Sequence, residues 1–383
     1  MRSLKLRIGI EDLYVYALSL FLIWKFLFTG VAWQGKLLSY ANLIFQLCSL
    51  VVPFFLVCSF VKRFRRGVVI PWIYVLIIGL LFISSRTTGD SVLIYSAIFV
   101  ILAYGLSFDR ISKTYLNTLL LCLSVLVVGC LSGVIADKTI EFSYGVGHSL
   151  GLAHPNNLAA LVMNISLVAS YRTLMKNEKK WVSVAIGLVV TSIAVNYITH
   201  SRTTTICLIC YAILIVIYRL LRVIKFEALI NTIKVAALLL ILGSIYLMTH
   251  FANLGSSLTG DVNAVVRFSN AYSLYKQYGI HLFGSAIEFI GVQKARSLGV
   301  SSVVLDSAYP NLLIYHGVVA FVIFFLFVVF VLRKTKLQKD NYLQIIILIF
   351  LMSGIMEQNV FMVQCDFVLL YLLAKVDTNN VLN

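Results

Sequence analysis

Long apolar runs recur along the whole chain, and they constrain its fold more than any other feature. A run of about 18 or more residues with few charges is long enough to cross a bilayer as a helix. Hydrophobic residues make up 61% of the 383 residues and charged residues 12%, whereas soluble domains carry about 25% charged residues. The sequence therefore predicts an all-α, polytopic membrane protein.

Hydropathy divides the chain into about twelve expected spans. They cover residues 13–30, 38–60, 68–85, 91–107, 115–136, 158–175, 181–198, 204–218, 229–249, 307–332, 342–356 and 359–374. The last two are short and meet at Glu357, so they form two helices, one broken helix pair or a re-entrant hairpin. No internal repeat separates the spans, which favours a single integral membrane domain over residues 1–383.

The excess of positive charge orients these spans. The chain has 31 Lys and Arg against 15 Asp and Glu, a formal net charge of +16. The basic residues gather in alternate loops, among them the loops that hold Arg2, Lys5 and Arg7, Arg63, Arg172 and Arg333. Because positive loops stay on the cytoplasmic side, the pattern predicts a multi-pass protein of the cytoplasmic membrane with both termini cytoplasmic. It accounts for the charge without a nucleic-acid partner.

The other polar residues fall mainly in the outer loops. Residues 137–157 form a medium outer loop, and residues 250–306 form a long one between spans nine and ten. The inner loops are short and lack the GxxxxGK[ST] pattern of a nucleotide-binding loop. The cysteines Cys48, Cys58, Cys122, Cys130, Cys207 and Cys210 lie in apolar runs, which favours buried hydrophobic side chains over metal or redox chemistry. We therefore expect the chemistry at the outer face, with no metal ion and no cofactor.

The stretch "GLAHPNN" allows two interpretations. Pro155 suits the first turn of a helix, and Asn156 and Asn157 can satisfy free N–H groups there, so the stretch is a capped start of span six. Alternatively, His154, with His148 on the same outer face, is a proton acceptor or a hydrogen-bond partner of a sugar.

Two arginines are candidates for binding an anion at that face. Arg202, in "THSRT", stands at the outer end of span seven, where an arginine either reaches lipid headgroups or pairs with an anion. Arg267 lies in a stretch where Val265, Phe268 and Tyr272 recur at helical spacing. This predicts an amphipathic helix that lies on the membrane, over a cavity or in solvent. The planar guanidinium matches the oxygens of a phosphate.

Three acids near apolar segments also stand out. Asp306 comes directly before span ten, where it caps the helix or acts as a base held at the membrane boundary. Glu357 lies at the joint of the last two expected spans, and Asp366 lies inside the last one. An ionisable residue inside a membrane segment is a functional candidate.

The order of these motifs resembles the O-antigen ligase/polymerase superfamily, and within it the Wzy-type repeat-unit polymerases of capsular and exopolysaccharide synthesis. The resemblance spans roughly residues 145–320 and rests on four short elements. They are His154-Pro155-Asn156, Ser201-Arg202, Arg267 followed by Leu282-Phe283-Gly284, and Asp306-Ser307-Ala308-Tyr309 with Gly317 after it. Ser307 replaces the usual asparagine, and Asp306 stands where the ligases have a histidine, which favours a polymerase over a ligase.

The resemblance implies a GT-C-like fold, an undecaprenyl-diphosphate-linked oligosaccharide as substrate, and metal-independent glycosyl transfer. It makes Arg202 and Arg267 the diphosphate-binding residues, and Asp306 or else His154 the proton acceptor. Glu357 is a further catalytic candidate because of its place at the joint of the last two expected spans. The expected substrate-binding residues are Asn156, Ser201, Tyr272 and Tyr309. A flippase and a chain-length regulator are the partners that the family leads us to expect, besides the bilayer.

Three other classes remain open. A ligase that transfers the glycan to another acceptor shares most of these features. A flippase or transporter needs charges along a path through the membrane, whereas Lys25 and Lys234 lie near the ends of their spans. A structural scaffold would function without Arg202, Arg267 and Asp306.

Overall fold

The structure is a computed structural model that describes residues 9–65, 67, 71–142, 145–221, 224–254, 262–291, 295, 297–300 and 302–376. Arg2, Lys5 and Arg7 of the expected first inner loop lie outside the described residues, as do parts of the expected outer loop at 250–306.

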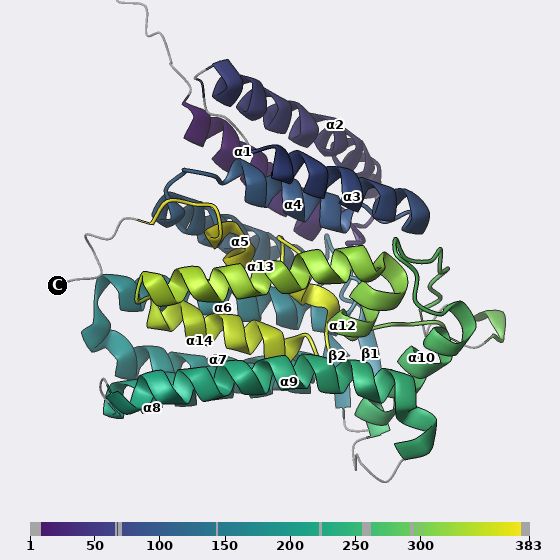
Figure 1. Cartoon of the computed structure of the whole chain (residues 1–383). Coiled ribbons are helices and arrows are strands. Elements are labelled where there is room, and N and C mark those ends of the chain that lie inside the picture. Colours follow the sequence, from purple (N-terminus) through teal and green to yellow (C-terminus); the bar gives the residue numbers. More distant parts are fainter. Residues whose placement is uncertain are drawn as a thin grey trace, which may run out of the picture. The chain divides into compact units, whose positions relative to one another are not determined.

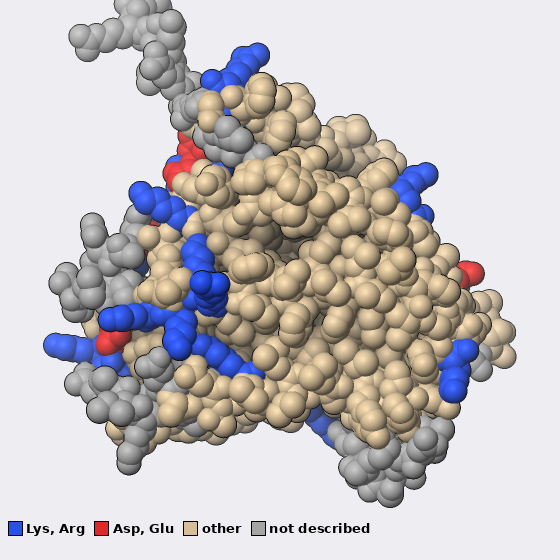
Figure 2. Space-filling model, in the orientation of Figure 1, with Lys and Arg blue, Asp and Glu red and all other residues tan. Residues whose placement is uncertain are grey.

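The described residues are mainly helical (Figure 1), and many of their helices are apolar. Within the described part of the chain, seven segments are long and apolar enough to cross a membrane: Lys36–Arg65, Phe108–Leu131, Pro155–Lys176, Glu178–Thr199, Arg202–Leu220, Lys234–Phe251 and Val318–Leu337. Three shorter apolar helices are α3 (Trp72–Thr88), α4 (Val92–Leu102) and α14 (Asn341–Ser353). Most of the surface shown in Figure 2 carries neither acidic nor basic side chains. These features indicate a membrane protein, as the composition predicts.

The chain forms two compact units built from interleaved segments. The first consists of Met1–Pro71, Ile98–Ile209 and Leu369–Asn383. It contains α1 (Ile10–Ile23), η1 (Trp24–Phe28), α2 (Lys36–Arg65), α5 (Phe108–Leu131), α6 (Pro155–Lys176), η2 (Glu178–Lys180), α7 (Trp181–Thr199) and the start of α8 (Arg202–Leu220). Helix α1 packs against α2 and α5, while α6 packs against α5 and α7. Helix α6 is mostly buried, so it forms the centre of this unit.

One end of the first unit is a short β-hairpin inside the expected loop at 137–157. Strands β1 (Thr139–Phe142) and β2 (Gly145–His148) pair antiparallel, with Thr139 opposite His148. The Asp137 carboxylate lies 2.6 Å from His148 Nδ1 and accepts the backbone N–H groups of Ser149 and Leu150. The loop expected at 137–157 therefore contains a pair of strands, and these polar contacts hold its two ends together.

Two arginines at the other end of this unit donate hydrogen bonds to backbone carbonyls. Arg63 is buried, and its guanidinium donates to the carbonyl oxygens of Leu102 and Tyr104. Helix α4 therefore ends at Leu102, whereas the sequence predicts a span to residue 107. Arg172 likewise donates to the Asp109 carbonyl and the Ser112 hydroxyl, each at 2.6 Å.

The second unit consists of Trp72–Ala97 and Cys210–Val368. It contains α3, α9 (Ile224–Leu254), α10 (Val262–Tyr278), α12 (Ala308–Pro310), η4 (Asn311–His316), α13 (Val318–Leu337), α14 and η5 (Gln358–Phe361). Helix α9 packs against α10 and α14, and α13 lies beside α14 (Figure 1). One core cluster joins Met248, Ala271, Leu274, Leu305 and Ile314. The expected long outer loop thus contributes a helix and buried side chains to the core of this unit.

Two expected spans near the end of the chain differ from the structure. The span predicted at 307–332 is broken: η4 is a π-helix that ends at His316, and α13 begins after Gly317, which has φ 95°. The span predicted at 359–374 forms no α-helix but two short 3-10 turns, η5 and η6 (Phe367–Tyr371). Asp366, a predicted functional candidate, is buried and accepts the backbone N–H of Val368 within this turn. Hydropathy reports burial, and both η4 and residues 359–374 are buried in protein without being long helices.

Candidate functional site

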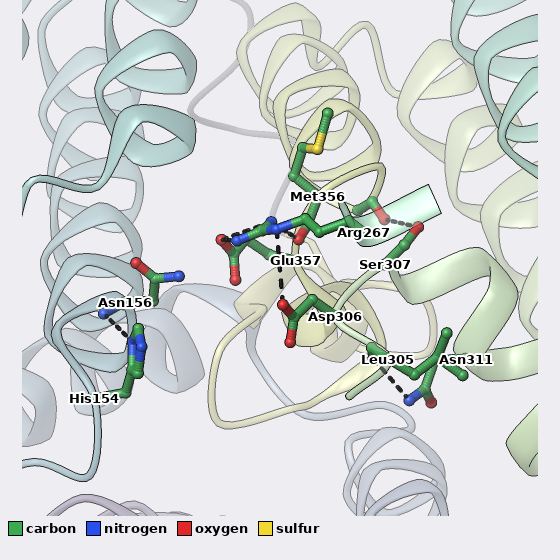
Figure 3. A network of polar contacts seen from close by, with 10 residues as sticks. His154, Asn156, Arg267, Leu305, Asp306, Ser307, Asn311, Met356 and Glu357 are labelled. Atoms are coloured by element: carbon green, nitrogen blue, oxygen red, sulfur yellow. Dashed lines mark hydrogen bonds and ion pairs between the residues drawn. The ribbon is translucent and has the colours of Figure 1, made fainter. Parts of the chain in front are cut away.

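Three predicted site residues meet around one guanidinium in the second unit. Arg267 extends from α10, and its Nη1 and Nη2 atoms each lie 3.3 Å from Glu357 Oε1 (Figure 3). Its Nη1 also donates to the backbone carbonyl of Met356. Its Nε atom lies 3.7 Å from Asp306 Oδ2. One cation from α10 is thus paired with two carboxylates that come from separate parts of the chain.

Local sequence explains how α10 presents Arg267. Phe268, Ala271 and Leu274 recur at helical spacing and are all buried, so one face of α10 packs on the core. The helix ends at Tyr278 and is followed by Gly279, which has φ 71° and whose N–H donates to the Tyr275 carbonyl. The predicted amphipathic helix is confirmed, and its apolar face packs on protein.

The two carboxylates differ in exposure. The side chain of Asp306 is 42% exposed, whereas that of Glu357 is 17% exposed and that of Arg267 is 19% exposed. Burial raises the pKa of Glu357 to about 7, with Arg267 opposing that rise and the charge of Asp306 adding to it. At neutral pH the site therefore changes between a net negative and a neutral charge as Glu357 takes up a proton.

Backbone contacts fix the segments that carry these acids. The N–H of Ala308 donates to the Gly354 carbonyl at 2.8 Å, and the Tyr309 hydroxyl donates to the Leu351 carbonyl. Ser307 is buried, with its hydroxyl 3.5 Å from the same Gly354 carbonyl. The start of α12 is thereby joined to the end of α14, which holds Asp306 near Glu357.

The Leu282-Phe283-Gly284 element crosses the helix break at Gly317. Backbone N–H groups of Val318 and Val319 donate to the carbonyls of His281 and Leu282, each at 3.0 Å. The N–H of Ser285 donates to the Tyr315 carbonyl, also at 3.0 Å. Two elements that the resemblance pairs only by their order in the sequence therefore contact each other.

His154 and Asn156 belong to the first unit, where they start α6. His154 is the N-cap, and its Nδ1 accepts the backbone N–H of Asn156 at 3.1 Å (Figure 3). Pro155 occupies the first helical position, as predicted. The predicted capped helix start is confirmed, with His154 as the N-cap.

Ser201 and Arg202 also belong to the first unit, at the junction of α7 and α8. His200 ends α7 in the left-handed region with φ 54°, and Arg202 is the first residue of α8. Ser201 is buried, and its carbonyl accepts the N–H and the hydroxyl of Thr205. Arg202 is exposed at the helix N-terminus.

The two tyrosines proposed to contact sugars lie in different environments. Tyr272, on α10, is half-buried, with its ring near that of Phe251 and Lys276 Nζ 5.6 Å from its centroid. Tyr309 is fully buried and its hydroxyl is bonded to Leu351. In this structure Tyr309 has no exposed ring face for a sugar, so it supports the Asp306 segment.

Other polar residues of the second unit have no counterpart in the sequence interpretation. Asp90 Oδ2 lies 3.9 Å from Nε2 of the buried His316, which precedes Gly317. The Tyr315 hydroxyl donates to the Thr88 carbonyl at 3.0 Å. In the sequence, the only feature that points to His316 is its position directly before Gly317, the glycine of the last motif. Among the described residues, no three His, Cys, Asp or Glu side chains are placed to hold a metal ion.

The arrangement supports two kinds of chemistry. A guanidinium held by a carbonyl and a carboxylate stabilises negative charge on a bound group. A half-exposed carboxylate beside it accepts a proton. Comparison with known proteins found no matching family model, curated protein or solved structure, so any activity has to be argued from this geometry and from the motifs.

Proposed function

We propose that the protein is a glycosyltransferase that polymerises undecaprenyl-diphosphate-linked oligosaccharide repeat units at the outer face of the cytoplasmic membrane. Its product would be a capsular, exo- or O-antigen polysaccharide. The observation that carries the proposal is the convergence of Arg267, Asp306 and Glu357. Arg267 and Asp306 belong to motifs of the resembled family, and Glu357 lies beyond the part of the chain that resembles it.

Arg267 is suited to hold the diphosphate of the donor. The Met356 carbonyl and Glu357 fix one side of its guanidinium. The contact with Asp306 is longer, at 3.7 Å, and Asp306 is the most exposed of the three side chains. A diphosphate oxygen can therefore replace Asp306 at the guanidinium while Glu357 stays in place. Arg202, at the exposed start of α8, is the second arginine that we assign to the diphosphate.

Asp306, released from Arg267, is the preferred proton acceptor. The hydroxyl oxygen of the acceptor sugar attacks the anomeric carbon of the donor, and its proton passes to the Asp306 carboxylate. The bond from the anomeric carbon to the diphosphate breaks, and the lipid diphosphate leaves with the electron pair. Arg267 stabilises that leaving charge. His154 remains the alternative acceptor, through Nε2, because its Nδ1 already accepts the Asn156 N–H.

The membrane arrangement is part of the same proposal. We assign a GT-C-like fold of about twelve crossings, of which the last, 359–374, consists of buried 3-10 turns and not of an α-helix. In this arrangement the termini and the ends that hold Arg63 and Arg172 lie on the cytoplasmic side. The positive loops support this orientation. The hairpin at Asp137 and the Arg267 site then face outward, where nucleotide sugars are absent and a lipid-linked donor is required.

The test uses purified protein in detergent with a lipid-diphosphate-linked repeat unit from the same gene cluster, without nucleotide or added metal. We expect a ladder of longer lipid-linked chains on a gel. Arg267→Ala should lower the initial rate by about 10²–10³-fold, and Arg267→Lys should recover part of it, since lysine keeps the charge but not the fork.

The matched control is Arg86→Ala, which removes an exposed arginine at the end of α3. It should polymerise at the wild-type rate. Transfer to a different acceptor without a ladder would identify a ligase. Movement of the intact lipid across vesicles without any new glycosidic bond would identify a flippase, and either result would overturn the polymerase assignment.

A further inference from the structure

Asn311 is a buried polar residue that the proposed chemistry does not use. It begins η4 and is 3% exposed. Its Nδ2 donates to the Leu305 carbonyl and to Gln358 Oε1, each at 3.3 Å (the first is drawn in Figure 3). Leu305 directly precedes Asp306, and Gln358 directly follows Glu357. One amide group therefore joins the immediate neighbours of both carboxylates.

The carbonyl oxygen of the same side chain differs from its amide nitrogen. Among the described residues, Asn311 Oδ1 is buried and has no hydrogen-bond partner. Leaving a buried carbonyl oxygen unpaired is unfavourable, and an apolar side chain of similar shape avoids it. The two hydrogen bonds from Nδ2 are therefore the reason for an asparagine at this position.

We propose that Asn311 is a positioning residue that sets the separation of Asp306 and Glu357 and so controls the charge of the Arg267 site. The bond from Ala308 to Gly354 joins the same two segments on one flank of the acids. Asn311 joins them on the other flank, at Leu305 and Gln358. The inference deepens the proposed function. It rests on that function only in the claim that the charge of the Arg267 site affects binding of the lipid-linked donor.

The positioning role has a measurable signature at Glu357. Burial and the charge of Asp306 both raise the pKa of Glu357 to about 7. Without the Asn311 bridge, the two segments can separate and water can reach Glu357. Both changes lower its pKa, because they weaken the repulsion from Asp306 and reduce the desolvation of the carboxylate.

The experiment is an infrared pH titration of the full-length protein in detergent. The protonated carboxyl band that disappears in Glu357→Gln is assigned to Glu357. We expect its midpoint to move to lower pH in Asn311→Leu and in Gln358→Leu. The double variant should shift no further than the larger single variant, because both substitutions remove the same bridge. Gln358 is only half-buried, so its variant keeps the test valid if Asn311→Leu does not fold.

The control is Asn164→Leu, which removes another buried amide, one that donates to the Tyr115 hydroxyl in the first unit. It should leave the midpoint unchanged even if it lowers the melting temperature. An unmoved midpoint in folded Asn311→Leu or Gln358→Leu overturns the positioning role, whether or not the protein polymerises. A shifted midpoint in a protein that never polymerises overturns the proposed function and leaves the positioning role intact.

Discussion

Gly284 and Gly317 pack backbone against backbone, and both have positive φ, 86° and 95°. A Cβ atom on Gly284 would lie 2.8 Å from the backbone carbon of His316, and one on Gly317 would lie 2.6 Å from that of Phe283. Any side chain at either position therefore pushes the crossing segments apart. The chain runs from Asp306 through α12 and η4 to Gly317. The position of this crossing therefore helps to fix the segment that carries Asp306.

We predict that Gly284→Ala and Gly317→Ala each lower the free energy of unfolding by roughly 2–5 kcal/mol, from backbone strain plus overpacking. Thermal unfolding in detergent measures the loss. Gly79→Ala, in α3 with open space around its Cβ position, is the control and should be neutral or slightly stabilising. Equal stability of all three variants would show that the crossing tolerates side chains.

Much of the site could be anticipated from local sequence, but its assembly could not. Arg267 and Asp306 stand out because their motifs occur in order, and Glu357 because an acid interrupts apolar runs. The contact between Arg267 and Glu357 joins positions 90 residues apart. No periodicity or spacing encodes such a pair, since it depends on how α10 and the segment after α14 pack.

The errors about the fold have a common physical cause. Hydropathy measures how apolar a segment is, and it does not distinguish burial in lipid from burial in protein. Residues 359–374 are apolar and were therefore predicted as a span, but they form 3-10 turns that are buried in protein. The break at Gly317 was not predicted, because a single glycine in an apolar run is compatible with a continuous helix.

The pH dependence of the protein should report on Glu357. A carboxyl group whose pKa is raised to about 7 favours the folded state at low pH. That stabilisation is complete below about pH 4.5, the ordinary value for glutamate, and is lost as pH rises through 7. We expect the melting temperature to fall between pH 5 and 8, and this fall to be absent in Glu357→Gln. A fall of the same size in Glu357→Gln would assign it to another group.

Substrate affinity should follow the same titration under the proposed function. With both carboxylates ionised, the charges around Arg267 sum to −1, and protonation of Glu357 brings the sum to zero. We expect KM for the lipid-linked donor to rise as pH increases through about 7. In Glu357→Gln the KM should not change over this range. A KM profile that is the same in wild type and variant would separate Glu357 from diphosphate binding.

Asp137 should control the stability of the β-hairpin without affecting the rest of the first unit. Its carboxylate accepts the N–H groups of Ser149 and Leu150 and pairs with His148. Asp137→Ala leaves those groups without these contacts, and we expect roughly 1–3 kcal/mol of local destabilisation. Hydrogen exchange of the hairpin amides measures it. Unchanged protection of those amides would mean that the strand pairing alone holds the hairpin.

The role of His154 can be decided by comparing two substitutions. As the N-cap of α6, His154 accepts the Asn156 N–H, and asparagine is a good replacement at such a position whereas alanine is not. A purely capping role predicts that His154→Ala destabilises the protein by about 0.5–2 kcal/mol, while His154→Asn keeps both stability and polymer formation. If His154 transfers a proton, both variants lose activity, and His154→Asn does so at wild-type stability.

Because Asp306 is the preferred acceptor under the proposed function, we expect His154→Asn to polymerise normally and Asp306→Asn to fail. Activity in Asp306→Asn together with inactivity in His154→Asn would reverse the assignment and move the proton acceptor to the start of α6.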